Sequence, residues 1–301
     1  MKEYIIMSFN IQSCKDYITK KFTPDTAAKA INQINPDILG LNEVRGMPFQ
    51  PTDDPSWFNQ IEELSKLTNM PYIYFGQAIT LKGPYGNAIL SKYPLKNIKT
   101  IAIPDPIIKD EDAFYESRCI ISCDIEDFHL FVTHIGLAKS EQINGISLLK
   151  ELIKKETKPT IITGDFNMTP DNPLIKELSE LVYDTANIFN EPLLSFPSIN
   201  PRIKIDYIFT SFNIEVIEAD IPQIVASDHF PYYAKIKLWH ICHSFLLLIK
   251  IKYSNHLYSL IGLIEPSLKY KSITFLIFLY SSTNSTFTSS LFFIFCFIIP
   301  W

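Results

Sequence analysis

The sequence is poor in cysteine, and its few cysteines follow no pairing pattern. There are five among 301 residues, an odd number, and no two are spaced as a CxxC pair. A disulfide framework or a zinc knuckle is therefore excluded as the basis of the fold. The first residues, Met1–Tyr4, also lack the long apolar core of a secretion signal. These absences favour a reducing, cytoplasmic setting.

The first four fifths of the chain have no excess of positive charge. Residues 1–238 contain 23 Lys and Arg against 31 Asp and Glu. Such a chain has no broad electrostatic attraction for a nucleic-acid backbone, although a local patch or a bound metal can still supply one. Residues 239–301 differ, with four lysines against one acid.

No segment offers the uninterrupted apolar run of a membrane-spanning helix. Residues 239–301 form a hydrophobic, low-complexity tail rich in Phe, Ile, Leu, Ser and Tyr. Phe245–Ile264 is long enough to span, but Lys250 and Lys252 interrupt it, and a spanning helix needs roughly 20 consecutive apolar residues. Two interpretations stay open: membrane association through residues 245–301, or a poorly ordered extension unrelated to catalysis.

Residues 1–238 are predicted to form one domain, in which short apolar runs alternate with helical patterns. Thr23-Pro24-Asp25 begins a helix with a hydroxyl cap, a first-turn proline and an acid. Asp54-Pro55 is expected to begin a second helix, and Ser140 to cap a third. Many short strands between few helices indicate packed sheets with helices outside, an α/β sandwich. The expected strands are Tyr4–Phe9, Asp37–Asn42, Asn87–Leu90, Ile98–Ile103, Arg118–Ile125, His129–His134, Thr160–Thr163, Ile203–Thr210, Ile214–Ala219 and Tyr232–Leu238.

Polar residues recur at or near the ends of these expected strands. Groups in such positions can converge on one rim of a sheet sandwich, where a rigid site belongs. The residues are Asn10, Glu43, His134, Asp165, Asn167, Asp206, Asp228 and His229.

The types of these residues suit one chemistry. Hard oxygen ligands, the carboxylates and amides of this set, favour Mg²⁺ or Mn²⁺ over zinc. A metal that neutralises phosphate charge, together with a base that activates water, hydrolyses phosphate esters. His229 is the natural base, because imidazole titrates near neutral pH. A buried Asp206 could hold its ring and stabilise the imidazolium.

Each motif also has a plain structural interpretation. Gly164-Asp165-Phe166-Asn167 could be a tight turn, because Gly, Asp and Asn all favour turns. Asp228-His229 could be a cap or a turn, and Glu43 could lie in an exposed, salt-bridged loop. These alternatives weaken because all of the motifs occur in one chain.

The ordered series of motifs resembles the endonuclease/exonuclease/phosphatase family over residues 3–238. The resemblance implies a four-layered α/β sandwich of two packed mixed or antiparallel sheets flanked by helices, with the site at one end. Two positions depart from the family pattern: Asn42 stands where Gln is common, and Ser195-Phe196-Pro197 where Thr-Phe-Pro is common. The motifs are Ser8-Phe9-Asn10-Ile11, Leu41-Asn42-Glu43-Val44, Tyr85-Gly86-Asn87-Ala88-Ile89-Leu90-Ser91, Thr133-His134, Gly164-Asp165-Phe166-Asn167, Ile205-Asp206-Tyr207-Ile208 and Ser227-Asp228-His229-Phe230-Pro231.

The resemblance implies a metal-binding set and a phosphate contact. Glu43 would be the principal ligand of Mg²⁺, or of Mn²⁺, with Asn10 beside it. Asp228 would lie near this metal or a second one. Arg118 matches a basic position of the subgroup and could contact phosphate or form a structural ion pair.

The resemblance also implies catalytic roles. Asp165 and Asn167 would orient the attacking water and the phosphate. Asp206 would pair with the general base, His229. His134 would stabilise the transition state.

The substrate stays open at this stage. His134 makes the chain more similar to sphingomyelinases, deadenylases and tyrosyl-DNA phosphodiesterases of the family than to its abasic-site endonucleases. We expect a monomeric Mg²⁺-dependent phosphodiesterase or phosphatase. One alternative is a nuclease on DNA or RNA, which would need a local basic patch from Lys82, Lys92, Lys139 and Arg202. Another is a membrane-tethered lipid phosphodiesterase resembling sphingomyelinases.

Overall fold

The computed structural model describes residues 2–109, 112–189 and 193–238, and beyond them the backbone of four strands. The chain divides into two compact units, Met1–Leu238 and Trp239–Trp301. In the described part of the chain, no helix combines the length and the apolar character needed to cross a membrane. The four strands of the second unit form one antiparallel sheet: β13 (Leu247–Tyr253), β14 (His256–Ser267), β15 (Ser272–Thr283) and β16 (Thr286–Ser290).

The side chains of this tail and its final segment, residues 291–301, lie outside the described residues. Membrane association through residues 245–301, or poor order there, therefore stays a prediction.

The first unit contains two six-stranded sheets. The first sheet comprises β1 (Lys2–Asn10), β2 (Ile38–Arg45), β3 (Tyr72–Thr80), β4 (Pro84–Ser91), β11 (Glu215–Asp220) and β12 (Tyr232–Leu238). The second comprises β5 (Leu95–Ala102), β6 (Cys119–Ile125), β7 (Phe128–His134), β8 (Thr160–Asp165), β9 (Tyr183–Asp184) and β10 (Asp206–Thr210). Their strand orders are β11-β12-β1-β2-β4-β3 and β5-β6-β7-β8-β10-β9.

A parallel pair lies at the centre of each sheet, β1 with β2 and β7 with β8. Helix α1 (Pro24–Ile34) joins the first pair and helix α3 (Lys139–Lys155) the second, because parallel neighbours need a crossover connection. The two strands of each pair end at the same edge of their sheet. Four of the predicted site residues lie at or near these ends: Asn10, Glu43, His134 and Asp165.

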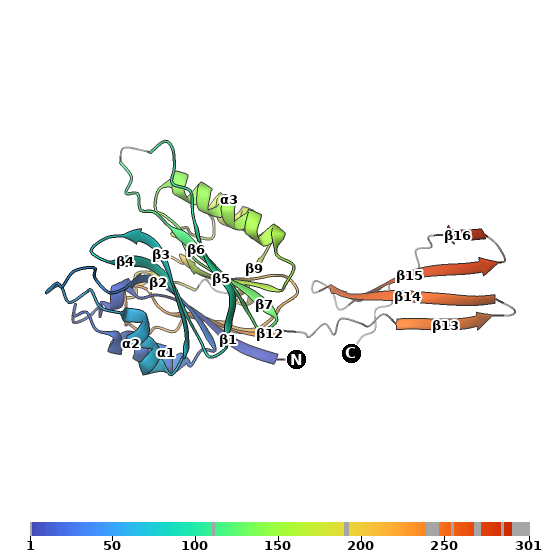
Figure 1. The fold of residues 1–301 in the computed structure, drawn as a ribbon, viewed down its shortest axis with the longest axis horizontal. Helices are drawn as coiled ribbons and strands as arrows, with labels where there is room; N and C mark the ends of the chain where they lie inside the picture. The colour runs from blue at the N-terminus through green and yellow to red at the C-terminus, as the bar shows by residue number, and fades with distance from the viewer. Residues whose placement is uncertain are drawn as a thin grey trace. The chain divides into compact units, whose positions relative to one another are not determined.

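Three apolar cores separate the layers of the first unit. Successive side chains of a strand point to opposite faces, so on β1 Ile6 packs between the sheets, whereas Met7 and Phe9 pack with residues of α1 and α2 (Gln60–Thr68). Residues of α3 and α4 (Pro173–Leu178) form a third core with the second sheet. Figure 1 shows α1 and α2 outside one sheet and α3 outside the other. The predicted four-layered α/β sandwich is confirmed.

Two predicted helix starts need correction. Asp54 does not begin α2; its carboxylate accepts hydrogen bonds from the backbone N–H and hydroxyl of Ser56 in a turn, and the helix begins at Gln60. Ser140 does not cap α3, which begins at Lys139; the Glu141 carboxylate instead accepts from the backbone N–H of Ala138, at 3.1 Å. By contrast, Thr23 caps α1 as predicted, accepting from Asp25 N.

Gly40 on β2 lies against the second sheet with no room for a side chain. A Cβ placed there would overlap Oγ1 of Thr163 on β8. We expect Gly40→Ala to destabilise the fold by about 1–3 kcal/mol, because overpacked cores lose that much. Thr163 Oγ1 is buried and makes no hydrogen bond to the described residues, so Thr163→Ala should restore part of the loss in the double variant. Urea unfolding of both single variants and the double variant measures this; strictly additive losses would contradict the overlap.

Candidate active site

One network of contacts joins every site residue predicted from the sequence. It runs from Glu43 through Asn10 to Asp165, at 3.0 Å for each hydrogen bond. Asp165 faces two histidines, His134 at 3.5 Å and His229 at 3.6 Å. The remaining members attach to these: Asp206 to His229, Asn167 and Arg118 to His134, and Asp228 to Asn10 through Gln12.

Asn10 bridges the two sheets through its side chain. Its Oδ1 accepts a hydrogen bond from the backbone N–H of Gln12, which leaves Nδ2 facing the carboxylates of Glu43 and Asp165. The amide group therefore holds two carboxylates from different sheets around one point. Its role as a metal ligand stays a prediction.

Glu43 stands in a strained backbone conformation. Its φ is 58°, in the left-handed region that is costly for a residue other than glycine. The pairing of β2 with β4 is irregular between Leu41 and Val44, as in a β-bulge, a feature common beside active sites. The bulge turns the half-buried Glu43 carboxylate toward Asn10.

Asn42 is a site residue that the sequence did not single out as functional. It is fully buried, and its Nδ2 donates to Asn87 Oδ1 at 2.9 Å and to the Thr133 carbonyl at 2.8 Å. Its Oδ1 accepts from the backbone N–H of Asp165 at 3.0 Å. Asn42 thus fixes the end of β8 against β2 across the gap between the sheets.

Gly164 explains the form of the motif around Asp165. A Cβ at this position would overlap the carbonyl oxygen of Thr133 on the neighbouring strand. Only glycine lets β8 approach β7 this closely. The hydrogen bond from Ile135 N to Asp165 O, at 2.9 Å, extends the pairing of β7 with β8 by one residue beyond the end of β7.

His229 and Asp206 form a buried pair. His229 Nδ1 lies 2.8 Å from Asp206 Oδ2, and Asp206 is fully buried. Burial alone would lower the pKa of His229, but the carboxylates of Asp206 and Asp165 outweigh it and raise this pKa to about 10. The Phe196 ring lies 4.8 Å from the imidazole, centroid to centroid, and covers it.

Asp165 is almost fully enclosed, with 1% of its surface exposed. Burial raises its pKa to about 7, and the nearby Asp206 adds to this, while His229 opposes it. Its Oδ1 accepts a hydrogen bond from Asn167 N at 2.9 Å. A carboxylate in this setting titrates near neutral pH.

His134 lies between two donor groups. The Arg118 guanidinium is 3.1 Å from His134 Nδ1 and can only donate, and Asn167 Nδ2, which donates to the Ile135 carbonyl, is 3.2 Å from His134 Nε2. Burial, together with the charges of Arg118 and His229, keeps the pKa of His134 well below its usual value. His134 is therefore a neutral imidazole whose Nε2 faces Asp165 and Asn167.

Arg118 is buried and engaged on two sides. One terminal nitrogen contacts His134, and the other forms an ion pair with Glu116 at 2.8 Å. Tyr85 of β4 lies beside this group, and its burial near Glu43 and Glu116 raises the pKa of its hydroxyl. The interactions seen are those of an ion pair that supports His134; a contact with phosphate stays a prediction.

Asp228 joins the network at its edge. Its Oδ2 accepts from the side chain of Gln12 at 2.7 Å and its Oδ1 from the Ser227 hydroxyl at 3.0 Å. Gln12 lies in a short 3-10 helix, Gln12–Cys14, with a left-handed φ of 45°. Gln12 was missed because no sequence pattern links a glutamine after β1 to a loop 216 residues later.

The ligand types around Glu43 fit a hard divalent cation. The carboxylates of Glu43, Asp165 and Asp228 offer oxygen donors, which suit Mg²⁺ or Mn²⁺, whereas Asn10 Oδ1 accepts from Gln12 N and its Nδ2 faces the carboxylates. Three possible ligand groups in the described part of this site lie within 4.8 Å of one another: Asp165, Asp206 and His229.

Comparisons with known proteins agree with this fold. A model of the endonuclease/exonuclease/phosphatase family matches residues 7–229. The uncharacterized protein YbhP of Escherichia coli (strain K12) is 22% identical over 249 residues, covering 77% of this chain and 96% of YbhP. An endonuclease/exonuclease/phosphatase from Beutenbergia cavernae has a TM-score of 0.64 at 16% identity, covering 94% of this chain and 82% of its own.

A mannosyl-6-phosphatase of Bacteroides thetaiotaomicron has a TM-score of 0.61 at 16% identity, covering 78% of this chain and 100% of its own. At such identities the solved structures show a shared fold. The family model, by contrast, spans most of the chain and ends on His229. The chain belongs to the endonuclease/exonuclease/phosphatase family.

Proposed function

We propose that this protein hydrolyses phosphate esters in a Mg²⁺-dependent reaction. One observation carries the proposal: the buried array Asp206–His229–Asp165 stands beside the Asn10–Glu43 pair, with both sheets contributing. A proton-transfer group and a hard-ligand set thus lie side by side, joined by the hydrogen bond from Asn10 to Asp165. Phosphate ester hydrolysis needs both functions close together.

The proton steps are proposed from the position of Asp165 between His229 and the Asn10–Glu43 pair. The carboxylates of Asp206 and Asp165 raise the pKa of His229, which favours its protonated form. Burial raises the pKa of Asp165 above its usual value, as suits a general base at neutral pH. In this proposal Asp165 takes the proton of the attacking water, rather than His229, which the sequence favoured. The His229 imidazolium, held by Asp206, stabilises the negative charge that grows on the phosphate.

His134 and Asn167 would bind the phosphate. In this proposal the Arg118 guanidinium at Nδ1 favours the His134 tautomer with its proton on Nε2, which would donate to phosphate once Asn167 Nδ2 turns away. Asn167 Nδ2 lies 3.2 Å from His134 Nε2 and is anchored on the Ile135 carbonyl at 2.9 Å. Preorganised donors of this kind stabilise charge that develops in the transition state.

Glu43, Asn10 and Asp228 would hold Mg²⁺. When bound, the ion neutralises phosphate charge and polarises the phosphoryl group. The carboxylates of Glu43 and Asp228 support this assignment, and Asn10 would join them by turning its Oδ1 from Gln12 N toward the ion.

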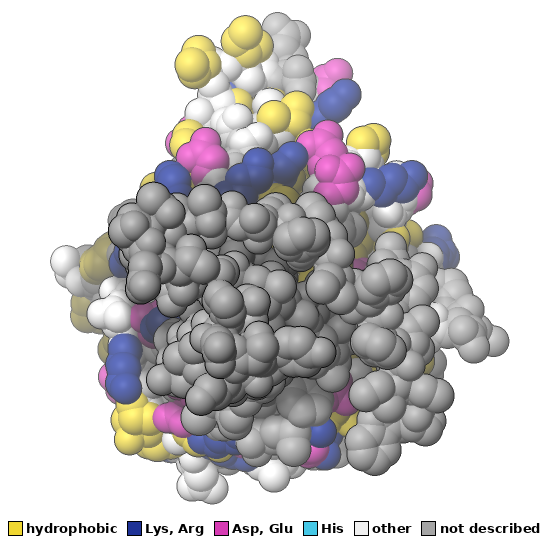
Figure 2. Space-filling model, turned by 90° about the vertical axis from the view of Figure 1, so that its right-hand side faces the viewer, with side chains coloured by type: hydrophobic (Ala, Val, Ile, Leu, Met, Phe, Trp, Pro, Cys, Tyr) yellow, Lys and Arg dark blue, Asp and Glu magenta, His cyan; other side chains and the backbone are white. Residues whose placement is uncertain are grey.

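For the substrate, we infer a small phosphate ester. The acidic balance of residues 1–238 supports this, and so does the structural similarity to a mannosyl-6-phosphatase. Two lysines considered for a basic patch are in ion pairs, Lys82 with Asp54 and Lys92 with Asp37. Away from the site, on the face at which β1 begins, basic side chains of the described residues lie beside acidic ones (Figure 2).

A panel of Mg²⁺-dependent assays tests the function. It comprises p-nitrophenyl phosphate, bis-p-nitrophenyl phosphate, sugar 6-phosphates, sphingomyelin and single-stranded DNA, with Asp165→Asn as the control protein. We expect phosphate release that requires Mg²⁺, stops with EDTA and is fastest on the small esters. Preference for DNA would support the nuclease alternative, and no turnover of any ester would refute the proposal.

Replacing Arg118 tests the proposed tautomer of His134, in which the proton lies on Nε2. Arg118→Met should lower kcat by about 100-fold with little change in KM, because His134 loses the donor that keeps its proton on Nε2. Arg118→Lys keeps a donor and should recover part of the rate. Lys29→Met, on the exposed face of α1, is the matched control. A rise in KM at unchanged kcat would instead place Arg118 on the substrate phosphate.

A further inference from the structure

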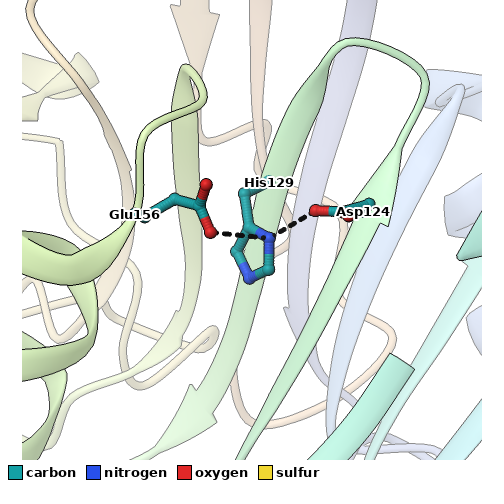
Figure 3. Close-up of side chains that lie close together, drawn as sticks. All are labelled: Asp124, His129 and Glu156. Carbon is teal, nitrogen blue, oxygen red and sulfur yellow. Dashed lines mark hydrogen bonds and ion pairs between the residues drawn. The ribbon is translucent and has the colours of Figure 1, made fainter. Parts of the chain in front are cut away.

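A second cluster of ligand-type side chains lies away from the proposed catalytic centre. Asp124 of β6 and His129 of β7 are register partners, and Glu156 directly follows α3. Figure 3 shows the His129 ring between the two carboxylates. His129 is five residues before His134 on one strand, which places the cluster roughly 16 Å from the catalytic histidine.

The two carboxylates converge on one atom of the imidazole. His129 Nδ1 lies 2.7 Å from Asp124 Oδ1 and 3.2 Å from Glu156 Oε2. The nitrogen carries at most one proton, which serves only one acceptor well. Ligands held about 2.1 Å from a common ion would themselves lie about 3.0–3.5 Å apart. The Nδ1–Oε2 distance falls in this range, and all three atoms lie within 4.8 Å of one another. The Nδ1–Oδ1 distance is shorter, so an ion would need Asp124 and His129 to separate by a few tenths of an ångström.

The other polar atom of each side chain is held by a different partner. His129 Nε2 lies 2.9 Å from the Ser122 hydroxyl. Asp124 Oδ2 accepts from Asn97 at 2.7 Å and from Lys158 at 2.8 Å. Glu156 Oε1 accepts from the backbone N–H groups of residues 157 and 158, at 2.8 and 2.9 Å. Partners of this kind orient metal ligands in known sites and leave three atoms pointing at one place.

The charge of the cluster also favours a cation. Two carboxylates and one lysine give a net charge of −1, before the imidazole is counted, in a largely buried place. Burial would raise the pKa of Asp124, but Lys158, Asn97 and His129 outweigh it and hold this pKa well below its usual range. Glu156 has 20% of its side chain exposed, which leaves one side open to solvent.

We propose that Asp124 Oδ1, His129 Nδ1 and Glu156 Oε2 bind a divalent transition-metal ion, with water completing the coordination. One imidazole nitrogen with two carboxylate oxygens suits Zn²⁺ or Mn²⁺. The ion would tie the β6–β7 hairpin to the turn between α3 and β8. This site is independent of the proposed hydrolase centre.

Zinc titration of the chelator-stripped full chain tests the proposal by calorimetry. Wild type should bind one more Zn²⁺ than Glu156→Gln or His129→Gln, while Ser122→Ala should bind the same number about 10- to 100-fold more weakly. Zinc bound elsewhere, including at the catalytic centre, is expected in all variants, so it does not affect the difference in zinc stoichiometry between wild type and each variant. Zinc should also raise the Tm of wild type more than that of Glu156→Gln.

Circular dichroism serves as the control for folding of each variant. If His129→Gln fails to fold, Glu156→Gln alone still tests the proposal. Mg²⁺-dependent hydrolysis should be unchanged in Glu156→Gln, which separates this site from the catalytic one. Equal zinc stoichiometry in wild type and folded Glu156→Gln would overturn the proposal and leave a protonated His129 in an ion-pair network.

Discussion

Replacing Asp165 by asparagine is expected to lower kcat by about 1,000-fold, within the range for loss of a positioned general base. The substitution removes the carboxylate that faces His229 Nε2 at 3.6 Å and that Asn10 holds at 3.0 Å. Asparagine keeps the size of the side chain and can still accept from Asn167 N. The measurement is steady-state hydrolysis of the best small ester in the panel, at saturating Mg²⁺.

Two further variants sharpen this prediction. Asp53→Asn, an exposed acid on the loop before α2, should leave kcat unchanged. The double variant Asp165→Asn/His229→Gln should lose little beyond Asp165→Asn alone, because groups that act as one unit are not additive. Independent, multiplicative losses would contradict a shared proton-transfer array.

The sequence predicts the positions of polar residues well where they lie at the ends of strands. Asn10, His134 and Asp165 end apolar runs that are clear in the sequence, and the two βαβ connections bring those ends close together. A layered α/β sandwich follows from the same runs, since alternate side chains of β1 fill different cores, whereas the number of layers came from the family resemblance. These features depend on apolar runs and on alternation along single strands, which can be recognised in the sequence itself.

Other features depend on contacts that no local pattern contains. Strand β3 was not predicted, because most of its residues are only half-buried and its apolar alternation is weak. The inter-sheet bond of Asn42 to Asp165 depends on the register of two separate sheets. The contact with His134 Nδ1 depends on Arg118 reaching it from the residue before the neighbouring strand β6. Long-range register, and not residue type, decides each of these.

A buried ion pair beneath the site gives the largest expected change in stability. Lys204 and Asp184 are both buried, with 2.9 Å between Nζ and Oδ2, and Lys204 Nζ lies over the Tyr207 ring. Lys204→Met should destabilise the fold by about 3–5 kcal/mol, because it leaves the buried Asp184 carboxylate without its cation. Urea unfolding at pH 7 measures the loss.

The double variant Asp184→Asn/Lys204→Met should be markedly more stable than Lys204→Met, because no charge remains buried. The introduced asparagine can still accept from Ala186 N, as the Asp184 carboxylate does at 3.0 Å.

The Lys204–Asp184 pair also predicts that the stability of the fold depends on pH. Burial lowers the pKa of Lys204 from 10.5 to about 8, although Asp184 opposes this. Between these two values the unfolded chain binds more protons, so the stability of wild type should rise with pH relative to the double variant. A flat difference between pH 8 and 10.5 would show that Lys204 keeps its proton in the folded state.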